Sequence, residues 1–164
     1  MKIILEGCDG TGKTTLAKML ADRYHLDICH CTSKDPKDFE FYKQTARKED
    51  VVWDRHTIGE LIYPDVFDRK PQITPEDARI ILGHARENGG KVFVLTAADD
   101  VIYDRLMSRD VPEDPRVLAQ LMFINRRFKF FAEYFCIPII DTSKLTINEI
   151  FDMIDTENDF RFIH

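Results

Sequence analysis

The feature that most constrains this chain is a glycine-rich run near its N-terminus, Gly7-Cys8-Asp9-Gly10-Thr11-Gly12-Lys13-Thr14. The run follows the short apolar segment Lys2–Glu6 and leads into Lys13–Tyr24, where apolar residues recur at helical spacing. Glycines permit a tight curl in which backbone N–H groups surround a phosphate, and the start of the following helix points further N–H groups at it. This order of strand, loop and helix predicts a cradle for a nucleoside triphosphate.

Two side chains complete the predicted phosphate site. Lys13 supplies a positive charge near the outer phosphates, and the Thr14 hydroxyl can bind a magnesium ion. A chance glycine-rich turn is the alternative interpretation, and the flanking strand and helix disfavour it. The predicted contacts with ATP are Gly7, Cys8, Asp9, Gly10, Thr11, Gly12, Lys13, Thr14, Thr15, Arg105 and Asp141.

Length and charge limit the classes of protein to which the chain can belong. Its 164 residues suit a single domain over 1–164, and 44% hydrophobic residues can form one sizeable core. The net charge of −6 argues against a protein that coats nucleic acid, although a local basic cleft is compatible with it. No apolar run approaches the ~20 residues that span a bilayer, and the N-terminus does not resemble a signal peptide. We expect a cytoplasmic protein without membrane contacts, and a viral protein acting in a host cytoplasm also fits.

Short apolar runs alternate with helical stretches, which is typical of a parallel sheet built from βαβ units. The predicted strands are Lys2–Glu6, Leu26–Cys31, Val51–Asp54, Lys91–Thr96 and Cys136–Asp141. The predicted helices are Lys13–Tyr24, Phe39–Lys48, Pro75–Asn88, Asp99–Arg109, Pro115–Tyr134 and Ile147–Ile154. The strands are rich in β-branched residues, which suits strands buried on both faces. The pattern therefore indicates an α/β fold.

A charged pair, Asp54-Arg55, ends the third predicted strand at the sheet edge where ligands bind in α/β folds. Asp54 can hold magnesium through water or accept a proton from the attacking oxygen. Arg55 can bind the phosphate of an acceptor. Glu60 and Tyr63 follow closely and can line an acceptor pocket. An ion pair that merely ends the strand is the alternative, and the shared edge with the phosphate loop favours function.

Arg105 and Arg109 are four residues apart, so on a helix they share a face. Two guanidinium groups near a triphosphate can neutralise the charge that builds on the transferred group. The proline-containing segment that follows predicts a mobile lid around residues 105–116. Solvated salt bridges with Asp104 and Asp110 are the alternative. Asp141, after the last strand, can contact the donor base or cap a turn.

These motifs together resemble the thymidylate kinase family. Glu6–Thr15 is similar to the family's phosphate loop, and Val52–His56 resembles its strand-end Asp-Arg motif. Asp99–Arg109 resembles the helix that leads into the arginine-bearing lid, and Ile139–Ser143 resembles the final strand and turn. The segments occur in the family's order and cover most of the chain. The segment Asp54–Tyr63 is most similar to that of the compact bacteriophage members.

The resemblance implies a three-layer α/β/α P-loop kinase fold, with the five predicted strands in the order 2-3-1-4-5. It implies ATP as the phosphoryl donor, Mg²⁺ as the cofactor, a deoxynucleotide acceptor, and a homodimer as is common in the family. Asp9 is expected to reach the deoxyribose hydroxyl of the acceptor, and Arg55 to grip its phosphate. The loop carries no arginine, so the lid residues Arg105 and Arg109 are expected to stabilise the transferred phosphoryl group.

Two parts of the family pattern differ in the acceptor half of the chain. Phe39–Lys48 stands where the family has an arginine-bearing helix, and Ser33–Pro36 replaces its Arg-Glu-Pro turn. A second phosphate near the loop would therefore need another cation. The candidates for that contact are Arg55, Lys34 and Arg47.

Three functions stay open at this point. The leading hypothesis is ATP-dependent phosphoryl transfer to a thymidylate-like deoxynucleoside monophosphate, with catalytic residues Lys13, Asp54, Arg55, Arg105 and Arg109. The alternative is a kinase acting on a hydroxyl of a deoxynucleoside, or of 5-hydroxymethyluracil in DNA, although the acidic charge weighs against DNA. The third is a nucleotide-binding regulatory protein without chemistry, which the intact set of catalytic side chains disfavours.

Overall fold

A computed structural model describes residues 1–32 and 34–156 and shows a five-stranded sheet in the order β2-β3-β1-β4-β5. Every neighbouring pair of strands is parallel. The strands are β1 (Lys2–Glu6), β2 (Asp27–His30), β3 (Val51–Asp54), β4 (Gly90–Thr96) and β5 (Ile139–Asp141). The predicted fold class and strand order are confirmed.

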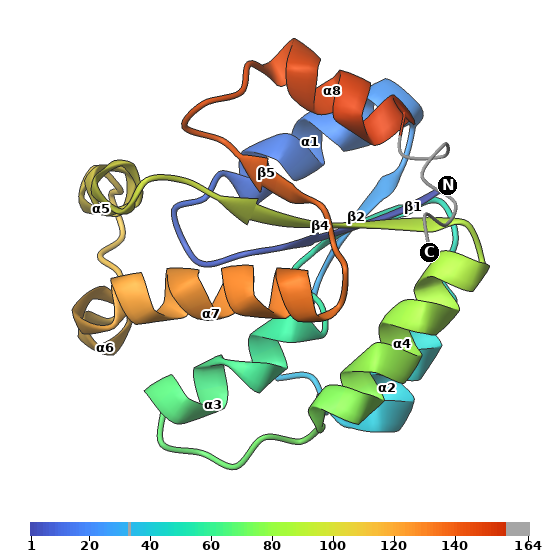
Figure 1. Ribbon diagram of the computed structural model, residues 1–164, viewed down its shortest axis with the longest axis horizontal. Coiled ribbons are helices and arrows are strands. Elements are labelled where there is room, and N and C mark those ends of the chain that lie inside the picture. Colours follow the sequence, from blue (N-terminus) through green and yellow to red (C-terminus); the bar gives the residue numbers. More distant parts are fainter. Residues whose placement is uncertain (33, 157–164) are drawn as a thin grey trace.

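Helices cover both faces of the sheet, as Figure 1 shows. On one face lie α1 (Lys13–Tyr24) and α8 (Ile147–Thr156). The other face carries α2 (Phe39–Thr45), α4 (Pro75–Glu87) and α7 (Leu121–Tyr134), with α3 (Tyr63–Val66) further from the sheet. Successive side chains along a strand point to opposite faces of the sheet, so they contribute to two hydrophobic cores. Ile3 and Leu5 of β1 pack with the α1 and α8 side, and Ile4 packs on the opposite side.

Three further elements lie towards the carboxyl ends of the strands. They are η1 (Ile58–Leu61), α5 (Asp99–Met107) and α6 (Pro115–Ala119). Figure 1 shows α5 beyond the carboxyl end of β4, with α6 below it. This end of the sheet also holds the loop between β1 and α1, so the site predicted from the sequence gathers here.

The element boundaries differ from the prediction in a few places. The predicted helix Pro115–Tyr134 is two helices, because the backbone at Gln120 leaves helical geometry, with φ −114° and ψ 14°. The predicted helix Asp99–Arg109 ends at Met107. The short elements η1 and α3, which follow the Asp-Arg pair, were not predicted. Within the part of the chain that the structure describes, no helix has the length and apolar character needed to cross a bilayer.

Candidate active site

The phosphate loop combines positive φ angles with close packing at two glycines, which leaves no room for a side chain. Gly7 has φ +139°, and a Cβ there would lie 2.3 Å from the carbonyl oxygen of Leu95. Gly10 has φ +80°, and its Cβ would lie 2.9 Å from Cγ2 of Ile102. Both contacts are too short, so the loop can pass between β4 and α5 only without side chains at these positions. The glycine requirement inferred from the sequence is thus explained by the packing.

The loop surrounds a cavity of about 340 Å³. Lys13 is buried, and its Nζ donates to the carbonyl oxygen of Cys8 at 2.7 Å. Burial, followed by the charge of Arg55, lowers the pKa of Lys13 below its usual value. The cavity is lined by Asp9, Gly10, Gly12, Lys13, Thr14, Thr15, His30, Cys31, Thr32, Asp54, Arg55 and Arg109.

Three residues that were predicted to contact ATP do not line this cavity and instead support the loop from its buried side. Gly7 lies under the loop against β4. Thr11 is buried, and its hydroxyl donates to the Cys8 carbonyl at 2.8 Å. Cys8 is also fully buried, and burial raises the pKa of its thiol to about 12. Its side chain therefore packs as a small apolar group, and any contact with a phosphate would come from the backbone.

Thr14 and Asp54 meet at the edge of the phosphate cavity. The Thr14 hydroxyl donates to Oδ2 of Asp54 at 2.6 Å, and Nδ1 of His30 lies 3.4 Å from the same oxygen. Among residues 1–32 and 34–156, no cluster of three or more His, Cys, Asp or Glu is arranged to hold a metal. A hydroxyl and a carboxylate facing a phosphate cradle nonetheless suit Mg²⁺, which takes few protein ligands and completes its shell with phosphate oxygens and water.

Asp9, Arg55 and Tyr63 form a contiguous group beside the loop. Arg55 forms an ion pair with Asp9, and the Tyr63 hydroxyl donates to the other carboxylate oxygen at 2.8 Å. Burial acts to raise the pKa of Asp9, but Arg55, Lys13 and Tyr63 outweigh it and hold the pKa below its usual value. The backbone of Arg55 has φ +74°, an uncommon conformation for a residue other than glycine. The strand-end pair predicted from the sequence thus bonds across to the phosphate loop.

A second cavity of about 710 Å³ opens beside the first, and the two share Asp9, Cys31, Thr32 and Arg55. The predicted acceptor residues Asp9, Arg55, Glu60 and Tyr63 all line it. Three further cationic side chains and several further aromatic ones also line it. The lining residues are Glu6, Asp9, Cys31, Thr32, Lys37, Tyr42, Arg55, His56, Gly59, Glu60, Tyr63, Phe67, Arg69, Glu113, Asp114, Arg116, Val117 and Phe128.

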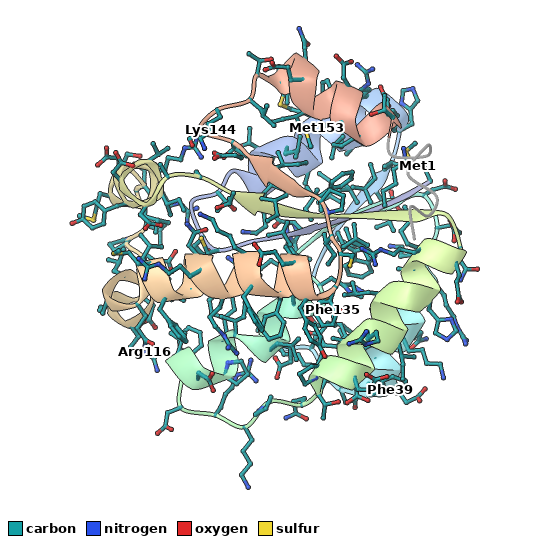
Figure 2. All side chains as sticks on the ribbon, viewed as in Figure 1. Met1, Phe39, Arg116, Phe135, Lys144 and Met153 are labelled. Carbon is teal, nitrogen blue, oxygen red and sulfur yellow. The ribbon has the colours of Figure 1, made fainter. Side chains whose placement is uncertain are left out.

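Of the three cations that the sequence suggested for a second phosphate, only Arg55 lines this second cavity. Lys34 and Arg47 do not line it, whereas Lys37, Arg69 and Arg116 do. Arg116 reaches from the start of α6 to within 4.6 Å of the Phe67 ring, and Figure 2 shows it on the side of α6 that faces α3. No local motif marks these three residues, because elements distant in the sequence bring them together.

Two buried glutamates also face the second cavity. The carboxylate of Glu60 accepts from both Nη atoms of Arg69, at 2.6 and 2.7 Å. Glu6, which the sequence did not single out, accepts from the Ile58 N–H at 2.7 Å through one oxygen. Its other oxygen is buried and has no hydrogen-bond partner among the residues that the structure describes. Burial raises the pKa of Glu6 to about 7, against the lowering effect of backbone N–H groups and Lys13.

The two predicted lid arginines both line a third cavity, and only Arg109 also lines the phosphate cavity. Arg109 lines the phosphate cavity and forms an ion pair with Glu113 at 3.3 Å. Arg105 does not line that cavity; its Nη1 donates to the Gly10 carbonyl at 3.3 Å and to the Thr142 hydroxyl at 2.9 Å. Arg109 thus lies at the phosphate cavity together with Lys13 and Thr14, while Arg105 connects the loop to the turn after β5.

A third cavity of about 520 Å³ lies between α1 and α8, beside Arg105 and Arg109. Thr142, rather than the predicted Asp141, lines it. The Asp141 carboxylate instead accepts from the N–H of Ser143 at 3.0 Å, as in the turn-capping alternative. Apolar side chains provide the rest of the wall, and a flat donor base fits such a surface. They are Leu16, Met19, Leu145, Ile147 and Ile150.

Comparisons with known proteins bear on the kind of enzyme. No protein-family model matches the chain. Cytidylate kinase 2 of Borreliella burgdorferi is 28% identical over 179 residues, covering 98% of this chain and 97% of that protein. Cytidylate kinase 2 of Borreliella afzelii is 27% identical, with 98% of both chains covered.

Solved structures support the fold. The YorR protein of Bacillus subtilis, described in complex with phosphorylated GDP, has a TM-score of 0.81 and 22% identity, covering 99% of this chain and 100% of its own. Deoxyadenosine kinase from M. mycoides with bound dATP has a TM-score of 0.60 and 16% identity, covering 97% and 100%. Together with the curated relatives, these likenesses support a nucleotide kinase and do not single out the thymidylate kinases.

Proposed function

We propose that this chain transfers the γ-phosphoryl group of ATP to the phosphate of a deoxynucleoside monophosphate. The observation that carries the proposal is the joining of two cavities at Asp9 and Arg55: a phosphate cradle around Lys13, and a larger cavity with four cations. A monophosphate acceptor needs such cations, because its dianion must approach another polyanion before phosphoryl transfer. The cations available to the acceptor phosphate are Lys37, Arg55 and Arg116, whereas Arg69, the fourth, is paired with Glu60.

The residues of the chain divide the reaction between them. Lys13 would turn from the Cys8 carbonyl to the outer phosphates of ATP, and Arg109 would neutralise charge on the transferred group. Arg55 would exchange part of its contact with Asp9 for the acceptor phosphate, leaving Asp9 free for a sugar hydroxyl. Mg²⁺ bound at Thr14 and Asp54 would neutralise negative charge on the β- and γ-phosphates.

The lid and the donor base complete this arrangement. We infer that residues 105–116 close over the phosphates, because they carry both Arg109 and its partner Glu113. The base of ATP would lie in the third cavity, with Arg105 and Thr142 at the loop end of that cavity. Asp141 would not contact the base itself, and would instead stabilise the turn that positions Thr142.

The identity of the acceptor base is a finer question than the reaction. The resemblance of the sequence implies thymidylate, whereas the names of the curated relatives imply cytidylate. Release of ADP should be measured with dTMP, dCMP, dGMP and dAMP in parallel. Stimulation by at least one monophosphate is expected, and Lys13→Ala should abolish it. If no monophosphate stimulates ADP release by the wild-type protein, the proposal is wrong.

One observation favours a second candidate, a kinase that acts on a hydroxyl. A hydroxyl must lose a proton as it attacks, and the buried Glu6 with its unpartnered oxygen faces the acceptor cavity as a potential base. A phosphate dianion needs no such base. Glu6→Gln should therefore abolish transfer to a deoxynucleoside or to 5-hydroxymethyluracil in DNA, and should leave transfer to a monophosphate largely intact. Labelled phosphate transfer to each acceptor class, by both proteins, distinguishes the two functions.

A further inference from the structure

The end of the acceptor cavity that lies away from the phosphate cradle contains an ion pair between a buried carboxylate and a half-buried guanidinium. Asp9 and Arg55 line both cavities and mark the end where phosphates meet, whereas Glu60 and Arg69 line the acceptor cavity and not the phosphate cavity. Glu60 comes from η1, and Arg69 from the connection between α3 and α4. An acceptor whose phosphate lies at Arg55 would therefore extend its base towards this pair.

The pairing fixes the Arg69 guanidinium in one orientation. Both Nη atoms of Arg69 donate to the Glu60 carboxylate, at 2.6 and 2.7 Å. The backbone N–H of Gln72 also donates to Glu60 at 3.0 Å, and the Glu60 side chain is 1% exposed. A carboxylate held by a backbone group and a two-point contact leaves the guanidinium little freedom to rotate.

The same pairing leaves donors unused. A guanidinium has five N–H donors, and the end-on contact with a carboxylate occupies one on each Nη. The Nε–H and one remaining Nη–H point in parallel along a second edge of the group. In the described part of the chain, these side-chain donors of Arg69 have no partner other than Glu60. The Arg69 side chain is 32% exposed and lines the acceptor cavity, so a ligand in this cavity can contact it.

The surrounding walls suit a flat aromatic ligand. Tyr42, Phe67 and Phe128 line the acceptor cavity and are absent from the lining of the phosphate cavity. Tyr42 lies close enough to Arg69 for the arginine charge to act on its hydroxyl. A base between such side chains would present one of its edges to the guanidinium.

We propose that Arg69, oriented by Glu60, reads the acceptor base and selects one with two adjacent hydrogen-bond acceptors on a single edge. Cytosine offers N3 beside O2, and guanine offers N7 beside O6. Thymine places an N3–H donor between its carbonyl oxygens, and adenine places an amino group beside N7 and N1, so neither accepts two parallel donors. The Glu60–Arg69 pair is therefore expected to favour dCMP and dGMP over dTMP and dAMP. The inference rests on the proposed function and specifies its substrate.

Steady-state kinetics with the four monophosphates test the inference. The wild-type enzyme is expected to show a kcat/KM at least about tenfold higher for dCMP or dGMP than for both dTMP and dAMP. Arg69→Met keeps the length of the side chain and removes its donors, so the four values should converge to within about threefold, mainly through KM. Arg69→Lys keeps the charge and loses the parallel donors, and should also lose the preference. Arg79→Met is the control. Arg79 lies on the exposed surface of α4 and contacts Tyr134 of α7, so this variant should keep the preference for dCMP or dGMP.

Two outcomes would overturn the inference and leave the kinase function standing. One is a wild-type preference for dTMP or dAMP. The other is an equal fall in kcat/KM with all four monophosphates in Arg69→Met, which would mean that Arg69 contacts the phosphate or the sugar of the acceptor instead of its base. If no monophosphate is phosphorylated at all, the proposed function fails instead. Calorimetric binding of the same four compounds then decides the inference separately, since equal affinities would overturn it.

Discussion

At the scale of single residues, buried charges at the site are stabilised by close neighbours of opposite charge. Asp9 is held by Arg55 and Tyr63, and Glu60 by Arg69. Removing one member of such a pair leaves the other buried and uncompensated, which costs more than the pair itself contributes. Substitutions that keep the shape and remove one functional group are therefore the more informative tests.

Thr14→Val is one such substitution for the proposed metal site. It removes the hydroxyl that donates to Asp54 at 2.6 Å and keeps the β-branched shape at the start of α1. We expect kcat/KM to fall roughly 10- to 100-fold and the Mg²⁺ concentration for half-maximal rate to rise. ADP release measured over a Mg²⁺ titration gives both values. Thr156→Val, at the end of α8, is the matched control. An unchanged Mg²⁺ dependence in Thr14→Val would remove Thr14 from the metal site.

Two glycines allow a direct test of the packing of the loop. Gly7→Ala places a Cβ at 2.3 Å from the Leu95 carbonyl oxygen in a backbone with φ +139°. We expect a loss of about 2–5 kcal/mol in the free energy of unfolding, from strain and overpacking together. Gly83→Ala, inside α4 with nothing within 4 Å of the new methyl group, should instead be neutral or stabilise by up to about 1 kcal/mol. Urea denaturation of both variants measures the contrast, and equal effects would contradict it.

At the scale of elements, the sequence was sufficient wherever a local pattern determines the structure. The central strands β1, β3 and β4 were predicted because apolar runs bounded by polar residues are buried on both faces of the sheet, whereas the edge strands β2 and β5 are partly exposed. The break at Gln120 was missed, since neither glycine nor proline marks it and the hydrophobic period continues on both sides. The elements η1 and α3 were missed because four-residue helices carry too little periodicity.

The site shows the same division. The loop around Lys13 and the pair at Asp54 were predictable because contiguous residues form them. Arg69 and Arg116 were not, because each reaches the acceptor cavity from an element whose position depends on tertiary packing. Glu6 had a possible signal, a charged residue at the end of an otherwise apolar strand, but its unpartnered oxygen is visible only in the folded chain.

The start of α4 offers a test at the element scale. Thr74 accepts from the N–H of Asp77, and the Asp77 carboxylate accepts from the N–H of Thr74 at 2.8 Å, forming a capping box. Thr74→Ala should lower the free energy of unfolding by about 1 kcal/mol, because a helix N–H loses its acceptor. Thr74→Ser keeps that acceptor and should stay within about 0.5 kcal/mol of the wild type. Chemical denaturation measures both, and equal losses would show that the threonine methyl group matters instead of the cap.

At the scale of the whole molecule, two buried ionisable groups give stability an opposing dependence on pH. Burial raises the pKa of Glu6 to about 7 from 4.5, so the folded state holds a proton between these values that the unfolded state has lost. Stability from this group falls as the pH rises through that window. Burial, with Lys2 nearby, lowers the pKa of His56 to about 3 from 6.5. Between these values only the unfolded state is protonated, so stability from His56 falls as the pH drops.

His56→Gln isolates the second effect. His56 lies between the Thr45 hydroxyl, 2.9 Å from Nε2, and the rings of Tyr42 and Trp53, so the variant should be less stable than the wild type at pH 7.5. Glutamine has no proton to gain. As the pH falls from 6.5 to 5, the difference in the free energy of unfolding between the wild type and the variant should therefore shrink by about 2 kcal/mol, at about 1.4 kcal/mol per pH unit.

Urea denaturation of wild type and variant at pH 7.5 and pH 5 measures this change, and Glu6→Gln provides a comparison of opposite sign. The amide resembles the protonated acid, so Glu6→Gln should match the wild type below pH 4.5 and gain on it steadily as the pH rises towards 7. All three proteins share the other buried carboxylates, such as Asp9 with its lowered pKa. The contribution of these groups to the pH dependence of stability therefore cancels when a variant is compared with the wild type. A gap between wild type and His56→Gln that stays constant with pH would mean that His56 takes up a proton equally in the folded and unfolded chain. The burial of its ring between α2 and β3 would then not control the acid stability of the molecule.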